Sequence, residues 1–297
     1  MKIVITGASG QLGSYLMDLA MEDHDVLGID LRPSSFRNHV SKINVGDIRD
    51  RNLIENSLRN CDVVIHCAAQ VSVVNSIRDP WYDLDVNVGG TITLLNASVN
   101  ARVKKFIYIS SAAVYGDPIS IPIKESHPLN PKSPYGASKM SAEQYCKVMS
   151  AISDLPFVII RPFNFYSPRA DPKSPYSGVI TRFVEWAKKG QPLKIEGDGE
   201  QTRDFIHAKD VARMIMMIAL SSVRGIAFNC GSGRGTSINA LAEAVVEACG
   251  KKIDVIHVSP RPGDIRNSIS DMSLARNCLQ FKSEIDLHQG LLEFFKD

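Results

Sequence analysis

The sequence "KIVITGASGQLGSYLMDLAM", residues Lys2 to Met21, joins a β-branched apolar run to a helix-period segment through a loop with three glycines. The apolar run predicts a buried strand, and the segment after the loop predicts an amphipathic helix. Gly7 allows a tight turn, Gly10 lets backbone approach a pyrophosphate, and Gly13 lets the helix pack closely on the strand. Because the amino end of a helix faces this loop, the stretch predicts a dinucleotide-binding unit.

The first half of the chain repeats this alternation of strand-like and helix-like segments. Continuous apolar runs indicate strands buried on both faces, and helices between them indicate parallel βαβ units. Strands are predicted at "DVLGID" (25–30), "CDVVIHCAA" (61–69), "KFIYISS" (105–111) and "FVIIRP" (157–162), with helices at 89–100 and about 136–150. The fold class is therefore α/β, with a doubly wound, Rossmann-like parallel sheet.

The composition and pattern of the sequence change after Pro162. The stretch "NFYSPRADPKSPYSG", 164–178, is rich in proline and serine and predicts a ligand-facing loop. Helices at about 179–189, 209–221 and 237–249 and short strands near 192–196, 226–231 and 253–258 follow it. We expect a cofactor-binding domain over 1–162, to which about 205–230 returns, and a smaller α/β substrate domain over most of 163–297.

The composition is that of a globular protein without a nucleic-acid partner. Of 297 residues, 44% are hydrophobic and 22% charged, and 34 basic against 32 acidic residues form no basic block. The six cysteines form no C-x-x-C pair and the histidines have no ligand spacing, so we expect no metal and no disulfide framework. The amino end has no signal-peptide pattern and the apolar run at 211–220 is too short to span a bilayer, so we expect a cytoplasmic protein without a membrane partner.

Asp30 ends the second predicted strand, where a carboxylate can accept hydrogen bonds from a ribose diol. The same carboxylate would repel a ribose phosphate, so the sequence favours NAD over NADP. Arg32, two residues later, is the competing signal, because an arginine can accommodate that phosphate. Asp47, in "VGDIRD", could meet the adenine amino group or could cap a turn or helix.

The stretch "PKSPYGASK", Pro131 to Lys139, places Tyr135 and Lys139 four residues apart, on one face of a predicted helix. Ser133 supplies a capping hydroxyl and the following proline suits the first turn. Alone, the pair describes a solvated helix face at least as well as a catalytic pair.

Further motifs follow one another over nearly the whole chain, from Gly7 to Asp264. They are "TGASGQLG", "GDIRD", "HCAA", "NVGGT", "SSAAVYG", "YGASK", "RPFNFYSPR", "GDGEQTRDFIHAKD" and "RPGD". In this order they resemble the extended short-chain dehydrogenase/reductase family. Within it the chain is similar to the NAD-dependent nucleotide-sugar epimerases, above all those of the UDP-glucose (UDP-galactose) 4-epimerase type.

The resemblance implies that Ser111, Tyr135 and Lys139 are catalytic. Tyr135 would take the proton of a sugar hydroxyl while its carbon gives a hydride to NAD, and Ser111 would hydrogen-bond the reacting oxygen. A tyrosine pKa of about 10 is too high for a base at neutral pH, so we expect the Lys139 ammonium and the positive nicotinamide to lower it. Lys139 would also hold the nicotinamide ribose.

The residues after Ser111 distinguish between the reactions of this family. Related sugar dehydratases and decarboxylases usually carry an acidic residue there, whereas this chain has Ala112 and Ala113. The reaction implied is therefore reversible epimerisation of a UDP-sugar at position 4, through a transient 4-keto sugar, with UDP-glucose and UDP-galactose as the expected pair. Many 4-epimerases have a threonine in place of Ala113, so one sugar contact is expected to be missing.

The resemblance also implies binding residues. Those expected to bind NAD are Gly7, Gly10, Gln11, Leu12, Gly13, Asp30, Asp47, Ile48, Ala68, Asn87, Tyr135 and Lys139. Those expected to bind the UDP-sugar are Ser72, Ser111, Tyr135, Asn164, Arg203, Arg261 and Asp264, with Ser76 as a further candidate. A polar helix start explains Asn87 nearly as well, and surface ion pairs are the alternative for the two arginines.

A homodimer is implied as well, built from helices near 87–101 and 135–150. Three other interpretations stay open. The first is another enzyme of the family, such as a UDP-glucuronate or UDP-N-acetylglucosamine epimerase. The second is an NADP-dependent reductase, and the third is a non-catalytic cofactor-sensing protein.

Overall fold

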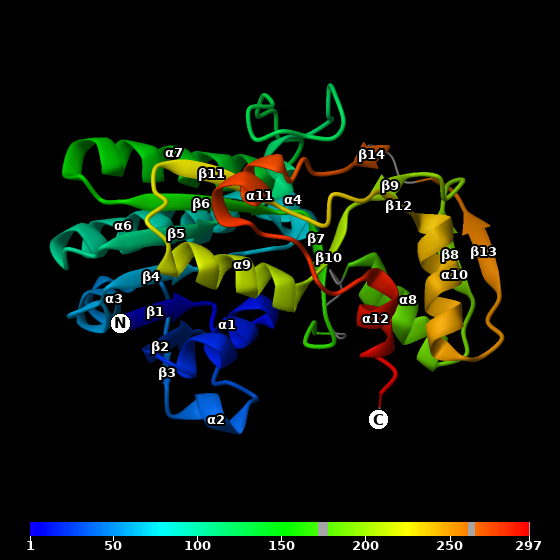
Figure 1. Cartoon of the computed structure of the whole chain (residues 1–297), viewed down its shortest axis with the longest axis horizontal. Coiled ribbons are helices and arrows are strands. Elements are labelled where there is room, and N and C mark those ends of the chain that lie inside the picture. Colours follow the sequence, from blue (N-terminus) through cyan, green and yellow to red (C-terminus); the bar gives the residue numbers. More distant parts are fainter. Residues whose placement is uncertain (172–177, 261–264, 297) are drawn as a thin grey trace. The chain divides into compact units, whose positions relative to one another are not determined.

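The computed structural model describes residues 1–171, 178–260 and 265–296, which form two compact units (Figure 1). The first unit comprises Met1–Gly116, Pro128–Pro162 and Ala212–Phe228, and the second comprises Asp117–His127, Phe163–Val211 and Asn229–Asp297. The segment Ala212–Phe228 lies within the range expected to return to the cofactor-binding domain. Asp117–His127 differs from expectation, because it lies inside 1–162 but groups with the second unit.

The first unit is built on a seven-stranded sheet in the order β11-β6-β5-β4-β1-β2-β3. Its strands are β1 (Lys2–Thr6), β2 (Asp25–Asp30), β3 (Ile43–Val45), β4 (Val63–His66), β5 (Lys105–Ile109), β6 (Phe157–Pro162) and β11 (Ile226–Cys230). β1 to β6 pair in parallel. The order reverses at β1, which lies between β2 and β4, and this confirms the doubly wound sheet.

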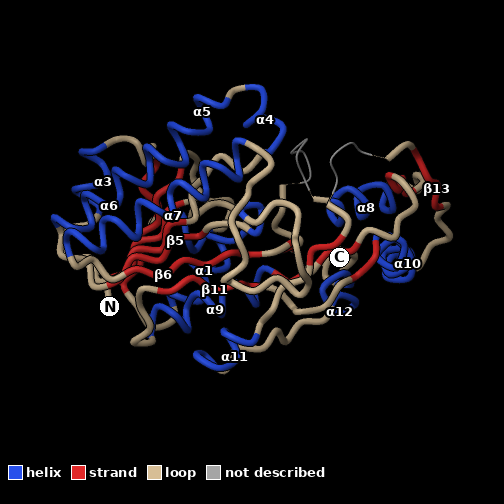
Figure 2. The backbone as a smooth tube through the Cα atoms, turned by 90° about the horizontal axis from the view of Figure 1, so that it is seen from above, coloured by secondary structure: helices blue, strands red, loops and turns tan. Residues whose placement is uncertain are grey.

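Helices cover both faces of this sheet (Figure 2), with α3, α6 and α7 on one face and α1 and α9 on the other. The elements are α1 (Gln11–Met21), α2 (Arg37–Val40), α3 (Arg51–Ser57), α4 (Val73–Arg78), α5 (Pro80–Leu84), the π-helix η1 (Asp85–Gly89), α6 (Gly90–Asn100), the 3₁₀ turn η2 (Ala112–Val114), α7 (Pro134–Ser153) and α9 (Ala208–Leu220). Every residue of β4, β5 and β6 is buried, as continuous apolar strands between two helical layers must be.

The second unit holds three small sheets, β10-β7, β12-β9-β14 and β13-β8. Its strands are β7 (Asn164–Tyr166), β8 (Leu193–Glu196), β9 (Thr202–Arg203), β10 (Phe205–His207), β12 (Thr236–Ser237), β13 (Val255–Val258) and β14 (Asn267–Ser268). Its helices are α8 (Val179–Lys188), α10 (Ile238–Cys249), α11 (Ser273–Leu279) and α12 (Leu287–Leu292). β7 lies at the start of the stretch predicted to be a loop, because three residues carry too little pattern to predict a strand.

A buried carboxylate links three segments of the second unit. Asp204 is fully buried and accepts hydrogen bonds from the backbone N–H groups of Ser232, Gly233 and Ser270 at 2.7, 3.0 and 3.0 Å. Ile123 belongs to this unit because it forms a bridge with Ser270. No helix among the described residues is long and apolar enough to cross a membrane.

Candidate active site

The glycine loop between β1 and α1 has no room for side chains at two of its positions. Gly7 has a φ of +69°, and a Cβ there would lie 2.7 Å from the backbone nitrogen of Ala68. A Cβ on Gly13 would lie 2.0 Å from the Gly7 carbonyl oxygen. Gly7 therefore makes the turn and Gly13 lets the helix approach it, as the spacing predicts.

The amino end of α1 faces the same loop. Gly10 precedes the helix in an extended conformation, its N–H donates to the Gly7 carbonyl at 3.1 Å, and no side chain caps the helix. The amides of Gln11, Leu12 and Gly13 form the first turn, where backbone N–H groups have no partner within the helix. A helix amino end beside a cradle of glycines is suited to a pyrophosphate, so these residues fit NAD.

Asp30 stands at the carboxyl tip of β2, where its carboxylate is held by backbone. Its two oxygens accept one hydrogen bond each, from the N–H of Ser9 at 3.0 Å and from the N–H of Arg32 at 3.1 Å. A carboxylate has about four lone-pair sites, so acceptors remain for a ribose diol. Arg32 thus helps to orient Asp30 through its backbone, while its side chain is exposed.

Asp47 is paired with an arginine that the sequence did not single out. The Arg49 Nε donates to Asp47 Oδ1 at 3.0 Å, and a terminal nitrogen of Arg49 reaches Asp85 at 2.6 Å. The hydrogen bond from Arg49 lowers the pKa of the Asp47 carboxyl, which therefore stays ionised. Ile48 is buried and packs against Gly90. A Cβ added to Gly90 would lie 2.4 Å from the Ile48 side chain. An adenine contact at this loop stays a prediction.

His66, at the end of β4, lies in a directed chain of hydrogen bonds. The Thr91 hydroxyl donates to the Asn87 carbonyl at 2.6 Å, so it must accept from His66 Nε2–H at 3.0 Å. His66 Nδ1 then accepts from the Thr6 hydroxyl at 2.7 Å, and that hydroxyl accepts from the Ala68 N–H at 3.2 Å. Burial, with the charge of Lys139 second, lowers the pKa of His66 to about 3, so the imidazole is neutral.

Asn87 lies inside the π-helix η1, not at a helix start as the sequence suggested. Its Oδ1 accepts from the Gln70 N–H at 2.8 Å, and its Nδ2 lies 3.1 Å from Asp83 Oδ1 and 3.0 Å from Ser138 Oγ. The side chain therefore connects the loop after β4 to the second turn of α7. Any contact with a cofactor would be additional to this structural role.

The start of α7 forms as predicted and brings Tyr135 to Ser111. The Ser133 hydroxyl caps the helix by accepting from the Gly136 N–H at 3.1 Å. The Tyr135 phenol is hydrogen-bonded to the Ser111 side chain. Ser111 itself opens the 3₁₀ turn, and its Oγ accepts from the Ala113 N–H at 3.1 Å.

Lys139 is almost fully buried, with 3% of its surface exposed, and points at the end of β5. Its Nζ donates to the Ile109 carbonyl at 2.6 Å and lies 4.8 Å from the centre of the Tyr108 ring. Burial lowers the pKa of this ammonium to about 8. The ammonium has three N–H donors and uses one of them for the Ile109 carbonyl. The other two can donate to hydroxyl oxygens, such as those of a ribose.

In this structure the pKa of the Tyr135 phenol is raised from its ordinary value. Burial raises it to about 12, against the Ser111 hydrogen bond, which lowers it, and Lys139 is not among the groups that act on it. In the chain by itself this pKa is therefore raised, because desolvation outweighs the favourable contact with Ser111, and a lowering by Lys139 together with the positive nicotinamide stays a prediction.

The two serines expected to reach the sugar, Ser72 before α4 and Ser76 within it, are both buried. Ser72 caps α4 by accepting from the Asn75 N–H at 3.0 Å, and 4% of its surface is exposed. Ser76 is fully buried, and its hydroxyl donates to the Val73 carbonyl at 2.7 Å. A sugar contact of either serine stays a prediction.

Two of the predicted substrate residues are neighbours in the second unit. Asn164 is exposed on β7, and its N–H donates at 3.0 Å to the carbonyl of Asp204, the residue after Arg203. Arg203 ends β9, and its guanidinium donates to the Thr202 carbonyl at 2.9 Å. An amide and a guanidinium are groups suited to phosphate oxygens, and the diphosphate contact of both residues stays a prediction.

Arg261 and Asp264 lie outside the described residues and stay predictions. Within residues 1–171, 178–260 and 265–296 no group of three His, Cys, Asp or Glu side chains is placed to hold a metal ion.

Sequence reasoning missed the buried polar residues around this site, above all Glu143 and Arg161. Their carboxylate and guanidinium form an ion pair at 2.6 Å. The available signal was that Glu143 follows Lys139 by four residues, which places both on one face of α7.

Comparison with known proteins agrees with this geometry. Residues 3–231 match the family described as "NAD dependent epimerase/dehydratase family". The chain is 34% identical to a UDP-glucose 4-epimerase of Mycolicibacterium smegmatis, with 100% of this chain and 99% of that protein covered.

Two solved structures are similar over 99% of this chain. A UDP-glucose 4-epimerase with UDP-glucose from Thermotoga maritima has a TM-score of 0.94 and 33% identity, with 98% of that chain covered. A UDP-N-acetylglucosamine 4-epimerase from Methanobrevibacter ruminantium M1, in complex with UDP-N-acetylmuramic acid, has a TM-score of 0.94 and 34% identity, with 97% of that chain covered.

Proposed function

The chain belongs to the NAD dependent epimerase/dehydratase family, and from this premise we propose that it interconverts the 4-epimers of a UDP-sugar, UDP-glucose and UDP-galactose foremost. The observation that carries the choice of reaction is the cluster of Ser111, Tyr135 and Lys139, followed by side chains without acid or base chemistry. A dehydratase or decarboxylase would need such a group at Ala112 or Ala113 to act on the carbon beside the transient ketone.

Bound NAD supplies a reversible acceptor for the hydride of the sugar's fourth carbon. The cradle for its pyrophosphate is Gly7, Gly10 and the first turn of α1, and Asp30 receives its adenine ribose. The free lone pairs of Asp30 would be close to a 2′-phosphate and would repel it, which favours NAD over NADP.

Tyr135 handles the proton. Its phenolate would accept the proton of the 4-hydroxyl as the fourth carbon gives up its hydride, and its phenol would return the proton to the keto oxygen as the same hydride returns to the other face of the sugar. Because burial holds the pKa of Tyr135 at about 12, a positive charge beside the phenol is required before it can act as a base near neutral pH. Ser111 holds the reacting oxygen, and Lys139 anchors a ribose hydroxyl.

The nucleotide diphosphate would be held by residues of the second unit. Asn164 and Arg203 present an amide and a guanidinium to it, and Arg261 and Asp264 complete the proposed set. Ser72 is the candidate for a sugar contact from the loop after β4. Because one or two polar contacts discriminate sugars by only a few kcal/mol, N-acetylglucosamine or glucuronate derivatives are the nearest alternatives.

The proposal is tested with a panel of four UDP-sugars: glucose, galactose, N-acetylglucosamine and glucuronate. Products are resolved by chromatography while the absorbance of reduced nicotinamide is followed. We expect UDP-glucose and UDP-galactose to interconvert without stoichiometric build-up of free reduced cofactor. Sustained build-up would contradict epimerisation and favour a reductase, and absence of turnover with every sugar would favour a cofactor-sensing protein.

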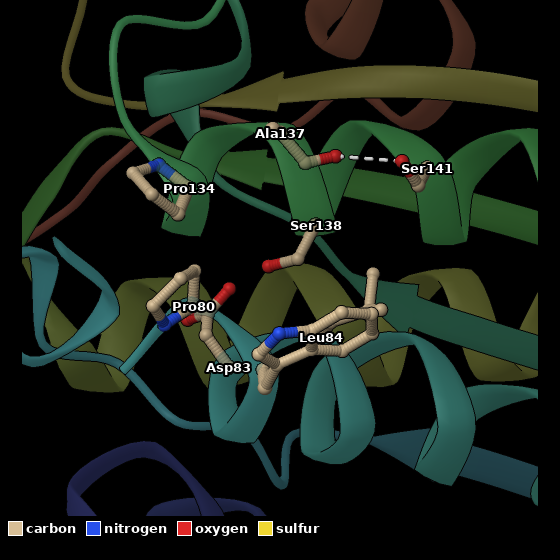
Figure 3. Close-up of a pocket in the computed structure, with 8 residues that line it drawn as sticks. Pro80, Asp83, Leu84, Pro134, Ala137, Ser138 and Ser141 are labelled. Atoms are coloured by element: carbon tan, nitrogen blue, oxygen red, sulfur yellow. Dashed lines mark hydrogen bonds between the residues drawn. The ribbon is translucent and has the colours of Figure 1, made fainter. Parts of the chain in front are cut away.

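The proposal includes a homodimer, supported by an apolar surface on α5 and α7. Trp81 and Leu84 on α5 are 78% and 43% exposed, and Val148 and Ile152 on α7 are 54% and 72% exposed. Between the two helices lies a pocket of about 290 Å³ (Figure 3), lined by Pro80, Trp81, Asp83, Leu84, Pro134, Ala137, Ser138 and Ser141.

This surface differs in part from the expected interface. Helix α6, which covers most of the range 87–101, exposes Asn96 and Asn100 in place of large apolar groups. We therefore assign the contact to α5 and α7, where a two-fold axis would bury both sets of apolar side chains.

The proposed compartment is the cytoplasm. All six cysteines are free thiols, of which Cys61, Cys146 and Cys230 are buried. Burial raises the pKa of the Cys61 thiol to about 11 and that of Cys67 to about 12, so these two are protonated and poorly reactive.

A further inference from the structure

A buried ion pair outside the reacting groups joins α7 and β6 to the stretch after β5 that carries Ser111. Glu143 on α7 is fully buried and Arg161 on β6 is 3% exposed. The contact is bidentate, with Arg161 Nε 2.9 Å from one carboxylate oxygen and a terminal nitrogen 2.6 Å from the other. Neither residue has a role in the proposed proton or hydride transfer.

The pair holds the chain on both sides of Ser111. The hydroxyl of Ser110, the preceding residue, donates to Glu143 at 2.6 Å. The Arg161 guanidinium donates to the hydroxyl of Tyr115 at 2.9 Å and lies 5.0 Å from the centre of its ring. Tyr115 closes the 3₁₀ turn that Ser111 opens, so Ser111 is fixed from both ends.

Lys139 and Glu143 both contact the end of β5. Glu143 follows Lys139 by one turn of α7, and Lys139 donates to the carbonyl of Ile109, the residue before Ser110. The end of β5 is thus attached to α7 at two successive residues, once through Lys139 and once through Glu143.

Stability alone is a poor reason for this arrangement. Taking a carboxylate and a guanidinium out of water costs several kcal/mol, and apolar residues of similar volume often stabilise a protein as well or better. What an apolar pair would lack is the set of directed bonds to Ser110 and Tyr115.

We infer that Glu143 and Arg161 are positioning residues of the proposed epimerase: their buried ion pair sets Ser111 against Lys139 and places a carboxylate one helical turn from the Lys139 ammonium. The expected effect on turnover rests on the proposed function. The expected effect on the protonation of Lys139 does not, because it depends only on the charges of this chain.

Several groups face Lys139 besides Glu143. The carboxylate of Asp83 and the thiols of Cys67 and Cys146 also favour its charged form, against burial as the largest influence. His66, also buried close by, is neutral. Replacing Glu143 by glutamine removes one of the two carboxylates and the negative charge that balances Arg161, so the Lys139 ammonium should lose its proton more easily.

The experiment uses the NAD-loaded protein and two readouts. The first is kcat and KM for the UDP-sugar. The second is the rate at which cyanate carbamoylates Lys139, measured by peptide mass spectrometry against pH, because only the neutral amine reacts. This second readout needs no turnover, so it separates failure of this inference from failure of the proposed function.

For Glu143→Gln we expect kcat to fall by about 10- to 100-fold with KM little changed, because a displacement of about 1 Å at the reacting groups has effects of this size. The midpoint of Lys139 labelling should move to lower pH. The matched control is Tyr115→Phe, which keeps both charges: kcat should fall by less, and the midpoint should stay in place.

If Glu143→Gln does not fold, the paired variant Glu143→Gln with Arg161→Met replaces it, since it leaves no buried charge unpaired. It should show the same loss of kcat and the same direction of shift. A labelling midpoint and a kcat equal to those of the unmodified protein, in whichever variant folds, would overturn the inference.

Discussion

Tyr135 is the residue on which the proposed chemistry depends most directly. Removing its hydroxyl in Tyr135→Phe should lower turnover by at least about a hundredfold, the usual size of a general acid–base contribution. NAD should stay bound, because the glycine loop and Asp30 are untouched, and the nucleotide released on denaturation measures this. Tyr145→Phe, on the exposed part of the same helix, is the control. Unchanged turnover in Tyr135→Phe would exclude Tyr135 from the reaction.

His66 gives a prediction about acid stability. Its pKa is about 3 in the folded chain and 6.5 when unfolded, so between these values only the unfolded chain binds the proton. The contribution of His66 is therefore complete above pH 6.5 and is lost as the pH falls, at about 1.4 kcal/mol per pH unit.

Denaturant unfolding at several pH values measures this loss. In His66→Gln, whose amide can replace both hydrogen bonds without titrating, the free energy of unfolding should fall less steeply below pH 6.5. The exposed His257→Gln should leave the slope as it was. A His66→Gln slope equal to that of the unmodified chain would contradict a neutral, buried His66.

At the scale of single residues, the sequence predicts the site residues that belong to a motif and misses the buried polar residues that do not. Tyr135, Lys139 and Asp30 belong to motifs with a known spacing, so the amino-acid sequence is enough to predict where they lie. Glu143 could not be told from a charge on a solvated helix face, and Arg161 lies in a predicted buried strand whose partner the sequence does not identify. Burial depends on which elements pack together, and a single helical spacing does not contain that information.

At the level of elements, the close contact between α1 and the glycine loop allows a test of the proposed pyrophosphate site. In Gly13→Ala the added methyl would lie 2.0 Å from the Gly7 carbonyl, so helix and loop must separate. We expect a loss of about 1–3 kcal/mol in the free energy of unfolding, typical of overpacking, together with weaker NAD binding by calorimetry. Gly178→Ala, where a Cβ meets nothing within 4 Å, is the control. Full NAD affinity in Gly13→Ala would contradict the proposed pyrophosphate site.

Helices and strands could be predicted from the sequence where the hydrophobic pattern extends over several residues. β2 and β6 have the predicted bounds, because a buried parallel strand is a continuous apolar run. β9 and β12 have two residues each and were not predicted, since their pairing is decided by neighbours distant in sequence. The π-helix η1 was missed for a similar reason, because its wider turn accompanies Asn87 contacts with the loop after β4 and with α7.

At the scale of the whole molecule, the proposed homodimer predicts which surface substitutions change the assembly state. Trp81→Glu places a charge on the apolar surface of α5 and α7 and should convert a dimer into monomers, as measured by sedimentation. Ile119→Glu is the control, because Ile119 is 81% exposed but belongs to the second unit. Near-full turnover in the Trp81→Glu monomer is expected, since Ser111, Tyr135 and Lys139 all come from one chain. A dimer that survives both Trp81→Glu and Val148→Glu would place the interface elsewhere.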